Sequence, residues 1–145
     1  MAKLKIILPL LALLLLAVVG MAVREAGRDG GDDAAEPVAV ACGNLLQGCR
    51  APFRGKTLEV GFSSAPSPLA PFELRVAAPS ARKVYAELAM VGMEMDANRY
   101  KLVKGDDGLW RGKAILPVCA SGRRDWMLTL EVDSGRIQIP FTTEK

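Results

Sequence analysis

The sequence predicts an all-β domain, an antiparallel β-sandwich of the immunoglobulin type with seven or eight strands, preceded by one apolar helix. Apolar and polar residues alternate with period two in short runs after residue 49, and turn residues separate the runs. No stretch after residue 23 carries a helical period. Such alternation is typical of strands with one face in a core, and many short strands with turns between them are typical of a sandwich.

Residues 1–23 are expected to be a membrane segment. Two lysines precede an unbroken apolar run over 6–23, which as a helix would measure roughly 27 Å, close to the thickness of a bilayer's hydrocarbon core. This length favours an uncleaved signal anchor, while a cleaved signal peptide, with Gly20 and Ala22 before the cleavage point, stays open. The lysines predict a single-pass bacterial inner-membrane protein with its C-terminal domain in the periplasm; a cleaved chain would be secreted there.

Residues 24–37 are expected to form a linker, because they are rich in Gly, Asp and Ala and contain no large apolar residue. Their closely spaced carboxylates lack the spacing of a calcium loop. The folded periplasmic domain is therefore expected to span residues 38–145.

Each predicted strand follows from its own alternating run, and Pro and Gly mark the connections between runs. "CRAPF" with Gly55 predicts a leading strand and hairpin, and Asp107-Gly108 and Ser134-Gly135 predict further turns. The remaining strands are expected at "KTLEVGF" (56–62), "FELRVAA" (72–78), "KVYAELAM" (83–90), "RYKLVK" (99–104), "LWRGKAIL" (109–116), "WMLTLEV" (126–132) and "RIQIPF" (136–141).

Three cysteines follow the secretion signal, so at least one disulfide is expected. Cys42 and Cys49 are the favoured pair, because the two glycines of "CGNLLQGC" let this short loop close. The rival pair, Cys49 with Cys119, would join the N-terminal strand to the body of the domain and stays open. A thiol–disulfide role for Cys42 and Cys49 is a weaker interpretation, since reactive pairs usually have the CxxC spacing.

Charge and composition argue against several classes of function. The formal net charge is +3 with no histidine, so the chain lacks the basic excess of a nucleic-acid-binding domain. Arg123 and Arg124 beside Trp126 are interpreted as a solvated turn. Without histidine, a Ser-His-Asp or Cys-His site cannot be built, and no phosphate-binding glycine loop occurs. We do not expect an enzyme.

The stretch "MVGMEM" contains Met90, Met93 and Met95. A thioether is a soft, neutral ligand that selects copper(I), and Cys119 could supply a further sulfur. Methionines also fill cores and line protein-binding surfaces. Met90 is expected in the core, in step with Val84 and Leu88 of its strand. Three interpretations therefore stay open: core packing, a surface that binds a partner, and a copper(I) site.

The segments "VGMEMDANRYKL", "DDGLW" and "LPVCASGRRDW" together resemble the FixH/YtkA-like group of bacterial proteins. These are small membrane-anchored or exported β-sandwich domains associated with cytochrome oxidase assembly and copper handling. The resemblance covers about a third of the chain and rests on Met93, Met95, Asn98, Arg99, Tyr100, Gly108, Leu116, Pro117, Cys119 and Trp126. The chain departs from histidine-bearing periplasmic copper chaperones, which leaves copper(I) or no metal.

The resemblance implies a non-enzymatic periplasmic accessory factor in oxidase assembly or copper(I) handling. Met93 and Met95, with Met90 and Cys119 as further candidates, would bind the ion. A respiratory oxidase subunit or a copper carrier would be the partner. The alternative is a structural interaction module without metal, in which the methionines and Trp110 form an apolar docking patch.

Overall fold

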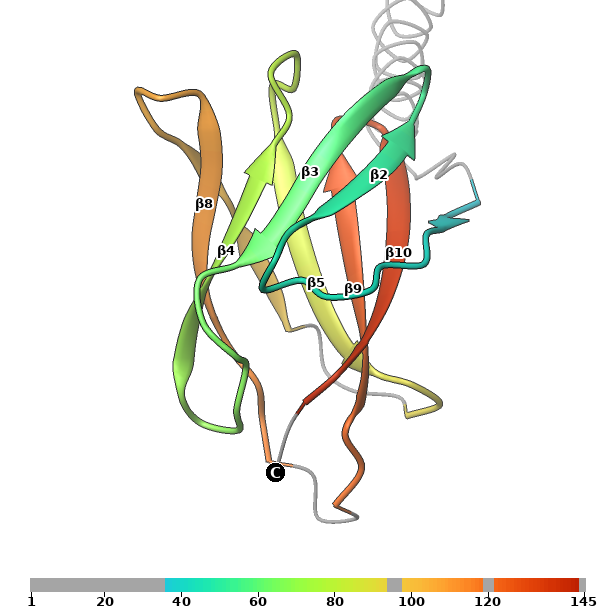
Figure 1. Cartoon of the computed structure of the whole chain (residues 1–145), viewed down its shortest axis with the longest axis vertical. Coiled ribbons are helices and arrows are strands. Elements are labelled where there is room, and N and C mark those ends of the chain that lie inside the picture. Colours follow the sequence, from blue (N-terminus) through green and yellow to red (C-terminus); the bar gives the residue numbers. More distant parts are fainter. Residues whose placement is uncertain (1–35, 94–97, 119–121, 144–145) are drawn as a thin grey trace, which may run out of the picture. The chain divides into compact units, whose positions relative to one another are not determined.

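The computed structural model describes residues 36–93, 98–118 and 122–143, and these residues form an all-β domain (Figure 1). They contain ten strands and no helix, so nothing within them is a helix long and apolar enough to cross a membrane. The predicted membrane segment and most of the predicted linker lie outside the described residues.

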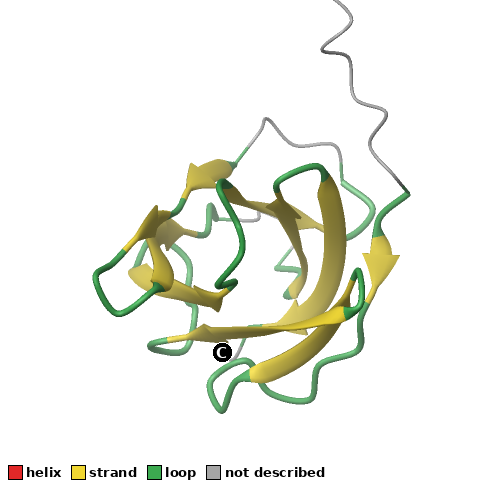
Figure 2. Ribbon diagram, turned by 90° about the horizontal axis from the view of Figure 1, so that it is seen from above, coloured by secondary structure: helices red, strands yellow, loops and turns green. Residues whose placement is uncertain are grey.

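The strands form two five-stranded sheets. One sheet has the order β1-β10-β9-β5-β6 and the other the order β2-β3-β4-β8-β7, and all pairs are antiparallel except β1 with β10. Seen along the strands, the two sheets face each other (Figure 2). The strand bounds are β1 Val38–Ala39, β2 Cys49–Phe53, β3 Lys56–Phe62, β4 Pro71–Ala77, β5 Val84–Met90, β6 Arg99–Lys101, β7 Val103–Lys104, β8 Leu109–Ile115, β9 Asp125–Val132 and β10 Gly135–Thr142.

The predicted strands are found with two differences. The run 99–104 is not one strand, because the chain leaves β5 and joins β8 at Leu102, which is buried between the sheets. Gly112 of β8 packs closely against this residue, since a Cβ there would lie 3.3 Å from Leu102 Cγ. Strand β1 was not predicted; it is only two residues long and pairs in parallel with Ile137 and Gln138.

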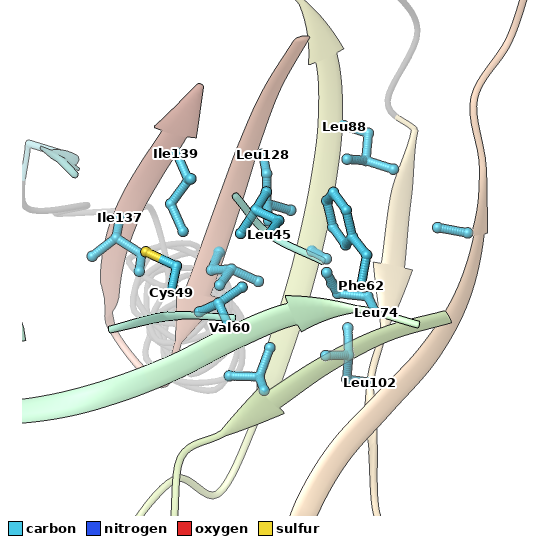
Figure 3. Close-up of a cluster of buried hydrophobic side chains, with 14 of the residues drawn as sticks. Leu45, Cys49, Val60, Phe62, Leu74, Leu88, Leu102, Leu128, Ile137 and Ile139 are labelled. Carbon is cyan, nitrogen blue, oxygen red and sulfur yellow. The ribbon is translucent and has the colours of Figure 1, made fainter. Parts of the chain in front are cut away.

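The core lies between the sheets and is built by the period-two alternation. On β9 every second residue from Trp126 to Val132 is buried, and the residues between them are half-buried on the outer face. Leucine, isoleucine and valine dominate the interior (Figure 3). Burial of these side chains is the main favourable contribution to folding.

The strands run between two ends of the sandwich that differ in their connections. One end, here the turn end, carries the connections 54–55, 78–83, 105–108 and 133–134. The other, the loop end, carries 40–48, 63–70, 91–98 and 116–124. In Figure 1 the turn end lies at the top and the loop end toward the bottom.

Prolines lie on the outermost long strands of both sheets. β1 covers only the first half of β10, where the N–H of Val40 donates to the carbonyl of Gln138 at 2.8 Å. The next residue of β10 that faces this edge is Pro140, which has no N–H to offer, and Pro52 lies on β2. Proline in these positions discourages another strand from pairing at the edge.

Candidate functional site at the loop end

Met90 is a core residue. It ends β5, is only 3% exposed and is paired across the ladder with Trp126 of β9. This burial was predicted from the alternation that places Met90 on the same face of the strand as Val84 and Leu88. The thioether therefore lies under the loop end, away from solvent.

Met93 is at the surface of the same end. The chain turns after β5 at Gly92, whose φ of +73° suits glycine, and the N–H of Met93 donates to the carbonyl of Met90 at 3.2 Å. The residue is 44% exposed. The other two candidate ligands, Met95 and Cys119, lie outside the described residues.

The two connections that contain Met95 and Cys119 start and end beside each other. The N–H of Val91 donates to the carbonyl of Asp125 at 3.1 Å. At the other side, Asn98 Nδ2 and the hydroxyl of Tyr100 donate to the carbonyl of Ile115 at 3.2 and 3.0 Å. Connections 91–98 and 116–124 are thus fastened to each other where they leave the sheets.

An ion pair stabilises the return of the chain into β9. The guanidinium of Arg123 donates to both carboxylate oxygens of Asp125. These hydrogen bonds hold the pKa of Asp125 below its ordinary value, so the carboxylate stays ionised. Elsewhere at this end the described residues include no group of three or more His, Cys, Asp or Glu arranged to hold a metal ion.

A disulfide joins Cys42 and Cys49, with their Cα atoms 5.6 Å apart. It closes a loop whose centre, Leu45, is buried and packs into the core. The carbonyl of Leu45 accepts hydrogen bonds from the N–H groups of Gly48 and Phe62, at 3.4 and 2.9 Å. The disulfide loop is therefore tied to the end of β3 and covers one side of the loop end.

A cavity of about 450 Å³ opens between the sheets at this end. Its walls come from the disulfide loop, from connection 63–70 and from the ends of β5, β9 and β10. Phe62 packs edge-to-face against Phe72 and Phe141, with ring centroids 5.0 and 5.2 Å apart. The lining residues are Cys42, Gly43, Asn44, Leu45, Leu46, Phe62, Ala65, Pro66, Val91, Asp125, Trp126, Pro140, Phe141 and Thr142.

Exposed large apolar side chains gather at the loop end. Those of the described residues on its connections are Leu46, Leu69, Val91, Met93 and Val118, and Ile115 ends the adjacent β8. Leu69 is the most exposed at 68% and has a positive φ of 61°. Of these residues only Met93 was expected at a binding surface from the sequence; for Leu69, the apolar tip of the proline-rich segment "SPLAP" was the available signal.

Trp110 does not belong to this surface, and the prediction that it joins the docking patch is wrong. It is 6% exposed and its Nε1–H donates to the carbonyl of Ala78 at 3.2 Å, at the turn end. Comparison of the chain with protein-family models, with curated proteins and with solved structures finds no match in any of the three.

Proposed function

We propose that this protein is a non-enzymatic accessory factor of the bacterial inner membrane that handles copper(I) during assembly of a respiratory oxidase. Its loop end would take up the ion through the sulfurs of Met93, Met95 and Cys119 and pass it to an oxidase subunit or a copper carrier. The observation that carries the proposal is the fastening of connection 91–98 to connection 116–124. Both sulfur-bearing segments therefore leave the sheets side by side.

The chemistry suits the residues. Thioethers bind copper(I) without losing a proton, and a thiolate adds a stronger soft ligand. A three-sulfur site can release the ion by ligand exchange, so the protein need not change the oxidation state of the metal. Met90 is not proposed as a ligand, because its burial between β5 and β9 would have to be undone first.

We further infer that the sandwich is of the immunoglobulin type. The orders β3-β4-β8-β7 and β10-β9-β5-β6 correspond to the ABED sheet and to a GFC sheet extended by one strand. β2 and β1 would then be additions before strand A. The apolar run 6–23 would anchor this domain at the periplasmic face of the membrane.

A copper(I) titration against a competing chelator tests the proposal. The reductant must leave the Cys42–Cys49 disulfide intact, so that its thiols do not bind copper. We expect one equivalent to bind, and the double variant Met93→Leu/Met95→Leu to lose it. Met127→Leu, a half-buried methionine on the outer face of β9, is the matched control and should bind like the unmodified chain. Equal binding by all three chains would contradict a methionine site.

The second candidate function is a docking module without metal, and the exposed apolar side chains at the loop end favour it. Leu69→Asp/Val118→Asp should then abolish association with the membrane complex, while Met93→Leu/Met95→Leu should leave it intact. If the protein is instead a copper carrier, Met93→Leu/Met95→Leu should abolish copper binding and Leu69→Asp/Val118→Asp should leave it intact. Affinity purification of the complex and the titration together separate the two functions.

A further inference from the structure

The turn end carries a cluster of exposed cations. Lys56 Nζ donates to the hydroxyl of Ser80 at 2.7 Å, and Lys104 Nζ donates to the carbonyl of Pro79 at 3.2 Å. Both ammonium groups are therefore fixed at the same turn, 78–83, although they come from β3 and β7. We call the set Arg54, Lys56, Arg82, Lys83 and Lys104 the cationic ring; all five are exposed.

The two sides of the ring are joined through the β9–β10 turn. Arg54 donates to the hydroxyl and the carbonyl of Ser134 at 3.0 and 3.1 Å. Next to it, Asp133 Oδ1 accepts the backbone N–H groups of Arg82 and Lys83 at 2.9 and 3.0 Å. The side chains of Arg54, Lys56 and Lys104 thus donate to hydroxyls and carbonyls, and within the described residues no side chain of the ring forms an ion pair with a carboxylate.

Carboxylates at this end only partly balance the ring. Asp107 is held by Arg111, which lowers the pKa of that carboxyl to about 2, and these two charges cancel. Asp133 is engaged by the backbone of the 78–83 turn. Glu36 and Asp106 are exposed. Among the described residues at this end, the five cations of the ring therefore exceed the three remaining carboxylates, Glu36, Asp106 and Asp133, so this part of the surface carries a net positive charge.

A small, mainly apolar hollow lies beside Arg54 and Lys56 of the ring, with Asp133 also in its lining. It measures about 170 Å³ and is formed between the β2–β3 hairpin, the 78–83 turn and the end of β9. Phe53, Leu58, Ala78 and Val132 contribute apolar walls, while Arg54 and Lys56 also line it. An apolar hollow beside cations matches a molecule that carries a phosphate next to hydrocarbon.

The described domain also begins at this end. Glu36 and Val38 line a shallow hollow with Arg54 and Gly135 of the two hairpins. The chain before them contains the apolar run 6–23, and the linker 24–37 would reach about 45 Å if fully extended. Such a linker alone would not decide which end of the domain faces a membrane.

From charge complementarity and this point of entry, we propose that the cationic ring binds the headgroups of anionic phospholipids, with phosphatidylglycerol as the test lipid. The inference rests on the membrane anchor of the proposed function. Binding turns the loop end, with Met93 and its neighbours, away from the bilayer and toward a partner. Because exposed charges act over about 8–10 Å at moderate salt, the contact is sensitive to ionic strength.

The test is a lysine-labelling experiment on the full chain in lipid nanodiscs, one set of phosphatidylcholine and one containing phosphatidylglycerol. Mass spectrometry follows the reaction of an amine reagent with each lysine. Lys56, Lys83 and Lys104 should react about three-fold or more slowly in the anionic discs, and about 0.5 M salt should remove the difference. Lys113, exposed on β8 away from the ring, should react equally in both.

Two variants of equal charge make the test specific. Arg54→Gln/Arg82→Gln should abolish the lipid-dependent protection, whereas Arg50→Gln/Arg75→Gln, on strands β2 and β4, should keep it. Melting curves check that both variants fold. Equal labelling of the ring lysines in the two lipids, or protection lost equally in both variants, would overturn the inference.

Whether the chain has a membrane anchor is measured separately, by its co-purification with the neutral phosphatidylcholine discs. A chain that does not co-purify with them lacks the anchor, while protection in the anionic discs still supports the ring. A chain that stays in the neutral discs but shows no lipid-dependent protection keeps its anchor and loses the ring.

Discussion

The two ends of the sandwich are built in opposite ways. At the turn end, short connections are cross-linked by side chains, as in the bonds from Arg54 to Ser134 and from Trp110 to Ala78. At the loop end, longer connections surround an open cavity and expose large apolar side chains such as Leu69. Binding residues are concentrated on loops that a rigid scaffold positions. The turn end is thus the more cross-linked of the two, and the cavity and exposed apolar side chains make the loop end the place where the proposed function puts recognition.

The largest expected effect is a loss of stability, and it tests whether the hydrophobic core extends to the loop end. Phe62→Ala removes a buried ring that contacts Phe72 and Phe141 and should cost about 3–5 kcal/mol of unfolding free energy. Phe53→Ala, a half-buried ring at the turn end, is the matched control and should cost about 1–2 kcal/mol. Denaturant titration measures both; the reverse order would break the comparison.

Reduction of the Cys42–Cys49 disulfide should have the next largest effect. The bond closes a short loop, with a sequence separation of 7, and its loss should destabilise the domain by about 2–3 kcal/mol. Denaturant curves of the oxidised chain and of Cys42→Ser/Cys49→Ser give the value. An unchanged midpoint would mean that Leu45 holds the disulfide loop in place without the bond.

A Gly→Ala substitution should lower the stability of the domain at the turn end and raise it at the loop end. In Gly135→Ala, the new Cβ would overlap the Phe53 ring and lie 2.8 Å from Arg54 Nε at the turn end, so the side chains of Phe53 and Arg54 must move at a cost of about 1–3 kcal/mol. In Gly43→Ala, on the disulfide loop, the Cβ would meet nothing within 4 Å, and a gain of about 0.5 kcal/mol is expected. Thermal melts measure both shifts, and a loss for Gly43→Ala would show that the loop end is packed more tightly than its cavity indicates.

The smallest effect is a pH dependence at the turn end. Hydrogen bonds from the backbone N–H groups of Arg82 and Lys83 hold the pKa of Asp133 below its ordinary 3.8. Because the folded-state value is lowered, Asp133 stabilises the fold above about pH 4, and this contribution is lost as the pH falls through the folded-state pKa. Asp133→Asn should remove this acid dependence, followed through the amide resonances of the 78–83 turn.

The sequence predicted the strands better than the ends of the molecule. Period-two alternation identified β3, β4 and β9 because burial on one face of a strand appears directly in the residue order. It missed β1, which is too short to show a period. It also missed the crossing at Leu102, because the run 99–104 looks like one strand although the chain passes from one sheet to the other at this buried residue. The all-β class itself followed from strand number and spacing, although the structure has ten strands where seven or eight were predicted.

The candidate site was only partly accessible from sequence. The methionine segment was visible, and Met93 is indeed exposed at a turn. The cavity was not, because its lining joins residues 42–46, Phe62, 65–66 and 140–142, which are distant in sequence and meet only at one end of the sandwich. Trp110 was assigned to the wrong environment because a tryptophan with period-two neighbours can lie in a core or on a patch.

Pro140 has a consequence for how this protein can associate. Beyond β1 the edge of β10 presents a residue whose backbone cannot donate a hydrogen bond. Edge strands of neighbouring copies therefore cannot readily pair into a continuous intermolecular sheet. Encounters are then limited to side-chain contacts that come apart again. In the proposed carrier role, the protein must bind a partner, transfer the ion and dissociate, and an edge that resists strand pairing favours this dissociation as well as solubility.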